Sequence, residues 1–68
     1  MEVIVNGESV KLPPRSTVSD LIAQLRPSSG PTGVAVAVNG EVVPVSRWRD
    51  TELKPGDKVD LVQAVQGG

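Results

Sequence analysis

The sequence predicts an α+β fold in which a mixed β-sheet carries one main helix on one face. Three observations predict it: stretches of β-branched residues with period-two alternation, two Asn-Gly dipeptides between such stretches, and one stretch with helical spacing. At 68 residues the chain forms one domain with one compact core, because a chain this short buries only about 60% of the surface that its unfolded form exposes.

The N-terminal segment predicts a β-hairpin. Residues 1–6 are rich in β-branched side chains, and residues 9–12 follow as the returning strand. Asn6-Gly7 lies between them and suits the positive φ angles of a tight hairpin turn. Because side chains alternate along a strand, Val3 and Val5 are expected to point to the core and Ile4 to the more open face.

A helix is predicted from about Val18 to Arg26. Thr17 and Asp20 have the spacing of a capping box, and Pro27 cannot continue the intrahelical hydrogen bonding. One apolar stripe with the i, i+3, i+4, i+7 spacing supports the helix. It consists of Val18, Leu21, Ile22 and Leu25.

Three further strands are predicted after a Pro-, Ser- and Gly-rich loop over residues 27–33. They cover residues 34–38, 41–43 and 58–64, with an Asn39-Gly40 turn between the first two and an irregular or single-turn helical segment at 45–50. The resulting order β-β-α-β-β-β predicts a β-grasp (ubiquitin-like) sheet whose first and last strands are parallel central neighbours. The domain is expected to span residues 1–64. Residues 65–68 are expected to form a flexible C-terminal tail that ends in Gly-Gly.

The open face of this sheet is expected to dock partner proteins. Alternation directs Val34, Val36 and Val38 toward the helix and Ala35 and Ala37 to the opposite face. An exposed apolar patch on so small a domain favours a partner site, and the alternative is that part of it lies under a loop. The expected docking residues are Ile4, Ala35, Ala37, Val62 and Ala64.

Composition excludes most other functions. The chain has no Cys and no His, so it offers no disulfide, zinc or iron-sulfur ligand set, no thiol nucleophile and no imidazole base. We therefore expect no catalytic residue, no metal and no bound cofactor. The net charge of −1 is spread along the chain, which disfavours nucleic acid. No apolar run is long enough to span a membrane and the N-terminal segment lacks a secretory signal pattern, so the cytoplasm is the expected location.

The C-terminal Gly67-Gly68 pair follows an uncharged Val65-Gln66 spacer. A tail without β-carbons can thread a narrow channel and place its carboxylate against the α-phosphate of ATP. A carboxylate must be activated before a nucleophile can displace an oxygen from it, and an acyl-adenylate serves that purpose. A sulfur nucleophile would then leave a thiocarboxylate on the backbone. The alternative is a frayed terminus without function.

The sequence resembles the ThiS sulfur carriers of thiamin biosynthesis over essentially the whole chain. The resemblance lies in Val38-Asn39-Gly40, in Val43-Pro44 followed by Trp48, in Gly56-Asp57 and in the ending Ala64-Val65-Gln66-Gly67-Gly68. It implies that Gly68 carries the sulfur as a thiocarboxylate and that Gly67 is a slender spacer, with ATP used by the partner. The implied partners are an adenylyltransferase related to ubiquitin-activating enzymes (ThiF or MoeB type), a cysteine desulfurase or rhodanese-type sulfur donor, and thiazole synthase (ThiG).

Three alternatives stay open at this point. A MoaD-type carrier for molybdopterin synthesis would use the same thiocarboxylate, and a ubiquitin-like modifier would conjugate Gly68 to lysines. A β-grasp interaction domain with an inert tail is the third.

Trp48 is expected to cover a core edge rather than to stack on a ligand. Arg47 and Arg49 are expected to form a solvated face.

Overall fold

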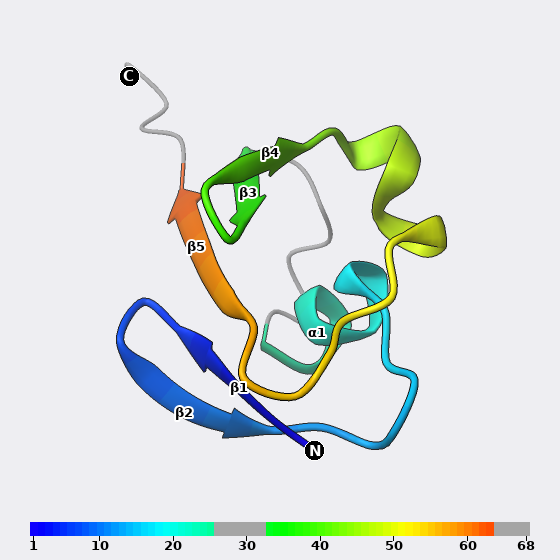
Figure 1. The fold of residues 1–68 in the computed structure, drawn as a ribbon. Coiled ribbons are helices and arrows are strands. Elements are labelled where there is room, and N and C mark those ends of the chain that lie inside the picture. Colours follow the sequence, from blue (N-terminus) through cyan, green and yellow to red (C-terminus); the bar gives the residue numbers. More distant parts are fainter. Residues whose placement is uncertain (26–32, 64–68) are drawn as a thin grey trace.

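The structure is a computed structural model that describes residues 1–25 and 33–63 (Figure 1). Within these residues the chain forms five strands, one α-helix and one 3-10 helix, and each lies where the sequence predicts an element of its kind. The elements are β1 (Glu2–Val5), β2 (Glu8–Lys11), α1 (Val18–Leu25), β3 (Val34–Val38), β4 (Glu41–Val43), η1 (Val45–Asp50) and β5 (Lys58–Gln63).

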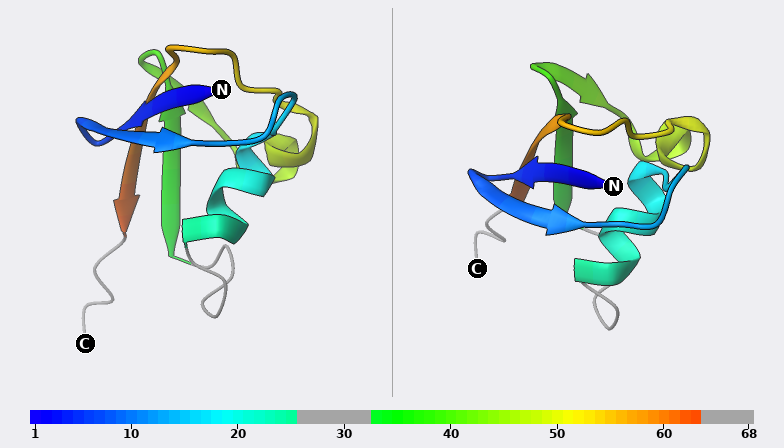
Figure 2. Two further views of the ribbon diagram at one scale, coloured as in Figure 1. Left: turned by 90° about the horizontal axis from the view of Figure 1, so that it is seen from below. Right: turned by 60° about the horizontal axis from the view of Figure 1, so that its bottom comes forward.

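The five strands form one mixed sheet in the order β2-β1-β5-β3-β4. β1 and β5 are parallel neighbours, and the other pairs are antiparallel. The predicted central pairing of the first and last strands is therefore confirmed. α1 provides the crossover and packs on one face of the sheet, as Figure 2 shows. The opposite face, called here the outer face, carries no helix among the described residues.

Both Asn-Gly dipeptides form the predicted hairpin turns. Asn6 and Gly7 have φ angles of 49° and 84°, and Asn39 and Gly40 have φ angles of 51° and 86°. Positive φ at both central residues gives a turn whose twist matches that of the flanking strands, and Asn and Gly tolerate this conformation best. The two turns fix the β1–β2 and β3–β4 registers.

The predicted capping box is present at the start of α1. The Thr17 N–H donates to Asp20 Oδ2 at 2.9 Å, and the Asp20 N–H donates to Thr17 Oγ1 at 3.2 Å. These two bonds satisfy backbone donors that have no partner within the helix. The helix is described to Leu25, and the predicted final residue Arg26 lies outside the described residues.

The core lies between α1 and the inner face of the sheet. Trp48 is 3% exposed, and its Nε1–H donates to the Val43 carbonyl at 2.8 Å, which confirms the predicted packing role. Arg47 and Arg49, on the same 3-10 helix, are exposed as expected. The buried apolar residues are Val3, Val5, Leu12, Val18, Leu21, Ile22, Val34, Val36, Trp48, Leu53 and Val59. The β-grasp prediction is confirmed.

Candidate functional site

The predicted reactive end of the chain follows the central strand of the sheet. β5 runs between β1 and β3 and is described to Gln63. The predicted site residues Ala64, Val65, Gln66, Gly67 and Gly68 lie outside the described residues, as does the predicted boundary between domain and tail. Because β1 and β5 are parallel, the last residues of β5 lie at the end of the sheet that is opposite to the N-terminus (Figure 1).

The outer face presents apolar side chains next to the end of β5. Val62 is 61% exposed and pairs directly with Ala35, whose side chain is also exposed. Ala37, two residues along β3, is half-buried on the same face. The structure therefore brings together three of the predicted docking residues.

The strand register adds one residue that the sequence prediction missed. Val42 pairs with Ala37 across the β3–β4 hairpin and is 74% exposed. Directly paired residues present their side chains on the same face, so Val42 extends the apolar surface onto the edge strand. We call Ala35, Ala37, Val42 and Val62 the outer-face patch. Alternation within residues 41–43, combined with the tight Asn39-Gly40 turn, is the sequence signal that could have found Val42.

Ile4 lies apart from the outer-face patch. It is half-buried, and its direct neighbours in register are Ser9 on β2 and Lys58 on β5. Lys58 and Asp60 are exposed, and they alternate along β5 with Val62, so all three side chains point to the outer face. The charged side chains of Lys58 and Asp60 therefore lie between Ile4 and Ala37. The predicted docking residues that the structure describes therefore form an apolar patch near the end of β5 and a separate apolar position bordered by charges.

A polar network holds the start of β5. The Asp57 carboxylate accepts hydrogen bonds from the Lys54 backbone N–H at 2.8 Å and from Asn39 Nδ2 at 3.1 Å. The Lys58 N–H donates in turn to Asn39 Oδ1 at 3.0 Å. These side chains are therefore engaged in shaping the turn that leads into the strand.

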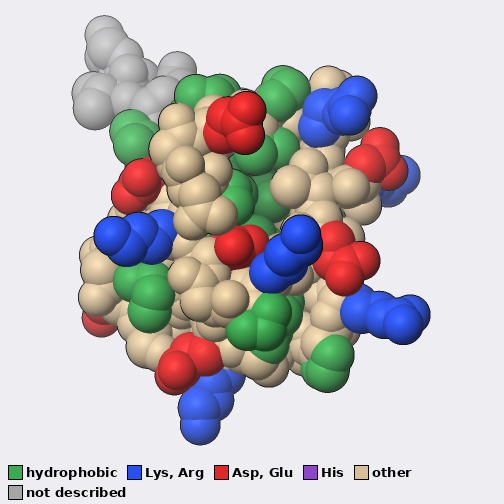
Figure 3. Space-filling model, in the orientation of Figure 1, with side chains coloured by type: hydrophobic (Ala, Val, Ile, Leu, Met, Phe, Trp, Pro, Cys, Tyr) green, Lys and Arg blue, Asp and Glu red, His purple; other side chains and the backbone are tan. Residues whose placement is uncertain are grey.

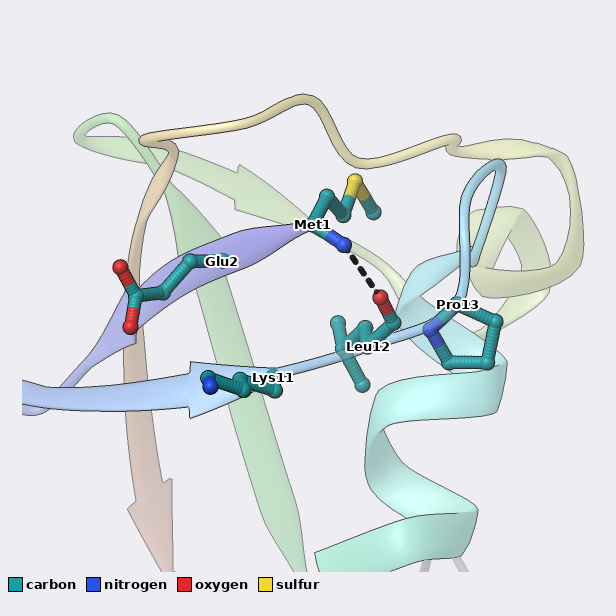
Figure 4. A pocket seen from close by; sticks show the side chains of 5 residues that line it. All are labelled: Met1, Glu2, Lys11, Leu12 and Pro13. Carbon is teal, nitrogen blue, oxygen red and sulfur yellow. Dashed lines mark hydrogen bonds between the residues drawn. The ribbon is translucent and has the colours of Figure 1, made fainter.

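A hollow at the other end of the sheet is lined by Met1, Glu2, Lys11, Leu12 and Pro13 (Figure 4). The N-terminal amine donates to the Leu12 carbonyl there at 2.7 Å. The Gly56 N–H donates to the Glu2 carbonyl at 2.7 Å, which places this hollow beside the start of β5. It is therefore remote from the strand end that leads to Gly68.

The charged side chains of both signs are mixed on the visible surface (Figure 3). On the face shown in Figure 3, Lys and Arg side chains alternate with Asp and Glu side chains without a patch of one sign. Within residues 1–25 and 33–63, no cluster of three metal-ligating side chains occurs. No helix in the same part of the chain is long and apolar enough to cross a membrane.

The fold and the site define a class: a ubiquitin-like β-grasp protein with an exposed apolar patch beside the end of its central strand. The ThiS family model matches residues 3–68, so the chain belongs to the ThiS family. The predicted resemblance to the ThiS sulfur carriers is confirmed.

Individual relatives agree with this assignment. The chain is 29% identical over 68 residues to "Sulfur carrier protein ThiS" of Escherichia coli (strain K12), with full coverage of both chains. It is 34% identical over 68 residues to "Thiazole synthase" of Paramagnetospirillum magneticum, and this match covers all of this chain and 20% of the relative. The crystal structure of the thiamine biosynthesis protein ThiS of Geobacter metallireducens superposes with a TM-score of 0.82, at 28% identity and with full coverage of both chains. A solution structure of a thiamine biosynthesis protein from the same organism gives a TM-score of 0.78 at 29% identity, covering all of this chain and 88% of the other.

Proposed function

We propose that this chain carries sulfur as a thiocarboxylate on Gly68 and delivers it to thiazole synthase in thiamin biosynthesis. The observation that carries the proposal is the match to the ThiS family, which extends to Gly68 and therefore includes both terminal glycines. The chain is the substrate of its partner enzymes in this scheme and supplies no catalytic group.

Two chemical steps load the sulfur. The Gly68 carboxylate attacks the α-phosphate of ATP in the partner adenylyltransferase, pyrophosphate leaves, and an acyl-adenylate forms. With hydrosulfide as the simplest nucleophile, a C–S bond then forms, the C–O bond to AMP breaks, and AMP leaves with the thiocarboxylate as product. Gly67 permits close backbone approach on the way to the reacting carbon, and Val65 and Gln66 provide the spacer.

Docking of the adenylyltransferase uses the outer-face patch. The patch borders the strand that leads into the tail, so a partner bound there lies close to the origin of the tail. An exposed apolar surface of this kind favours a protein partner. Ile4 and Ala64, the two other predicted docking residues, would contribute at the border of that contact.

The remaining partners follow from the chemistry of the carrier. A cysteine desulfurase or a rhodanese-type protein would supply the sulfur, and the cytoplasm would hold the exchange. Thiazole synthase as acceptor is supported by the relative of that name, in which a segment similar to this chain forms 20% of a longer chain. ATP is bound by the adenylyltransferase, and the carrier itself would hold no cofactor.

Intact-protein mass spectrometry tests the proposal. The chain is incubated with ATP, a ThiF-type adenylyltransferase and sulfide, and its mass is compared with that of the untreated chain. We expect a gain equal to the difference between one sulfur and one oxygen atom, and fragmentation that places the gain on Gly68. An unchanged mass with an enzyme that loads another ThiS protein in parallel would overturn the proposal, and adducts to lysines would favour a protein modifier.

Replacing Val62 with Glu is expected to weaken adenylation while the fold stays intact. Val62 is 61% exposed, so the new carboxylate remains hydrated in the isolated chain but is desolvated in the complex. We expect kcat/KM for pyrophosphate release to fall by about tenfold or more, since truncating or charging a central interface residue costs on the order of 2 kcal/mol.

Val45→Glu is the matched control, because Val45 is a 53% exposed valine on η1 and therefore off the outer face. Val42→Glu should reproduce the loss if the patch acts as one surface. Equal kinetics for wild type and Val62→Glu would reject docking through the outer-face patch.

A further inference from the structure

The side chain of Asn6 continues the pairing between β1 and β5 beyond the end of β1. Two backbone bonds join the strands first: Ile4 N–H donates to the Asp57 carbonyl at 2.8 Å, and Asn6 N–H donates to the Val59 carbonyl at 2.9 Å. The chain then turns away, because Asn6 and Gly7 adopt positive φ. The next position of the ladder therefore has no backbone partner on β1.

The carboxamide of Asn6 takes that place. The Leu61 N–H donates to Asn6 Oδ1 at 2.9 Å, and Asn6 Nδ2 donates to the Leu61 carbonyl at 3.0 Å. The side chain thus supplies one acceptor and one donor, as a further β1 residue would have done. The two residues are 55 positions apart in the sequence.

We use the word hook for an Asn side chain that accepts a hydrogen bond from a backbone N–H of β5. The Asn6 hook determines how far β5 is held from both sides. On the β3 side, pairing continues through Ala35↔Val62 and Val34↔Gln63. On the β1 side, the backbone groups of alternate β5 residues point to β1, and within the described part of the chain Leu61 is the last of them to have a partner. Leu61 is therefore the last residue of β5 fixed from both sides, and Gly68 follows it by seven positions.

We propose that Asn6 is a positioning residue that sets how far along β5 the strand is held from both sides before the chain continues to Gly68. The inference rests on the function proposed above. Without the hook, the end of β5 is held by β3 alone, and more backbone must be ordered when the terminal carboxylate enters a partner. Because each ordered residue adds an entropic cost to binding, the loss is expected in KM rather than in kcat.

The chain contains a matched control for this role. Asn39 also has positive φ, also precedes a Gly, and also accepts a hydrogen bond from a β5 backbone N–H through its Oδ1. Its hook lies on Lys58, at the start of β5, remote from the strand end that leads to Gly68. Asn6→Gly and Asn39→Gly both keep the left-handed turn, since Gly adopts positive φ without strain, and each removes one hook.

The experiment compares wild type, Asn6→Gly and Asn39→Gly under conditions where circular dichroism shows all three to be folded. NMR-detected hydrogen exchange reports the hook itself. We expect the Leu61 amide to exchange about fivefold faster in Asn6→Gly and the Lys58 amide to do so in Asn39→Gly. Each substitution removes two side-chain hydrogen bonds, and one of the two is the bond to that amide. Unchanged Leu61 exchange in Asn6→Gly would overturn the inference.

Adenylation kinetics with ATP and a ThiF-type adenylyltransferase test the positioning role. Asn6→Gly should raise KM about fivefold at unchanged kcat, whereas Asn39→Gly should match wild type. Equal KM values in all three chains, or an equal rise in both variants, would overturn the inference alone. A wild-type chain that is not adenylated would overturn the proposed function and this inference with it.

Discussion

Deleting Gly68 is expected to abolish sulfur loading. The deletion transfers the terminal carboxylate to Gly67 and draws it back by about 3.3–3.6 Å, the span of one extended residue. A misplacement of about 1 Å at a reacting centre can already cost about 100-fold in rate. We therefore expect no mass gain and an adenylation rate at least about 100-fold below that of the full chain.

The deletion should leave the stability of the domain unchanged. The core, as far as the structure describes the chain, extends from Val3 to Val59, so its apolar contacts do not depend on Gly68. The midpoint of thermal unfolding is the matching measurement. Gly68→Ala keeps the length and the carboxylate and is expected to load more slowly than wild type, because its β-carbon obstructs close approach. Loading of the deleted chain at the wild-type rate would contradict a defined position for the carboxylate.

Local sequence signals predicted most of the fold because their physical causes are local. The Asn6-Gly7 and Asn39-Gly40 turns follow from the cost of positive φ for other residues, and all four φ angles are positive. The capping box joins Thr17 to Asp20, three residues further along the chain, and could be recognised from this spacing alone. Parallel pairing of the first and last strands followed from the crossover through the helix.

The composition of the outer-face patch could be predicted only in part, because it depends on register. Alternation identified Ala35, Ala37 and Val62 as outward residues, and the structure places them together. It could not reveal that Lys58 and Asp60 lie between Ile4 and Ala37, since that arrangement depends on how β1, β5 and β3 align.

The hydrogen bonds of Asn6 illustrate a second limit of local reasoning. The Asn-Gly signal accounts for its backbone, but its carboxamide binds Leu61, a residue distant in the sequence. No propensity connects the two positions, because the contact exists only after β1 and β5 have paired. One residue thus forms the turn through its backbone and holds the central strand through its side chain, which is why its second role follows from tertiary structure alone.

Replacing Leu21 with Ala is expected to unfold a large fraction of the protein. Leu21 is 0% exposed and belongs to the face of α1 that covers the sheet. Truncation of a buried leucine typically costs about 2–5 kcal/mol, from lost burial and from the cavity left behind. A single core in a chain of this length rarely supplies more than about 3–5 kcal/mol in total. The substitution therefore removes most of the free energy of unfolding.

Thermal unfolding followed by circular dichroism checks this expectation against Leu25→Ala. Leu25 lies one turn further along α1 and is 39% exposed, so its truncation leaves no closed cavity. We expect the melting midpoint to fall by at least about 10 °C for Leu21→Ala, since 1 kcal/mol shifts the midpoint of a small domain by about 4–8 °C. Leu25→Ala should shift it by no more than a few degrees. Similar shifts in the two variants would show that α1 does not stabilise the sheet through its buried face. Some other contact would then have to hold β5, the strand that leads to Gly68, in place.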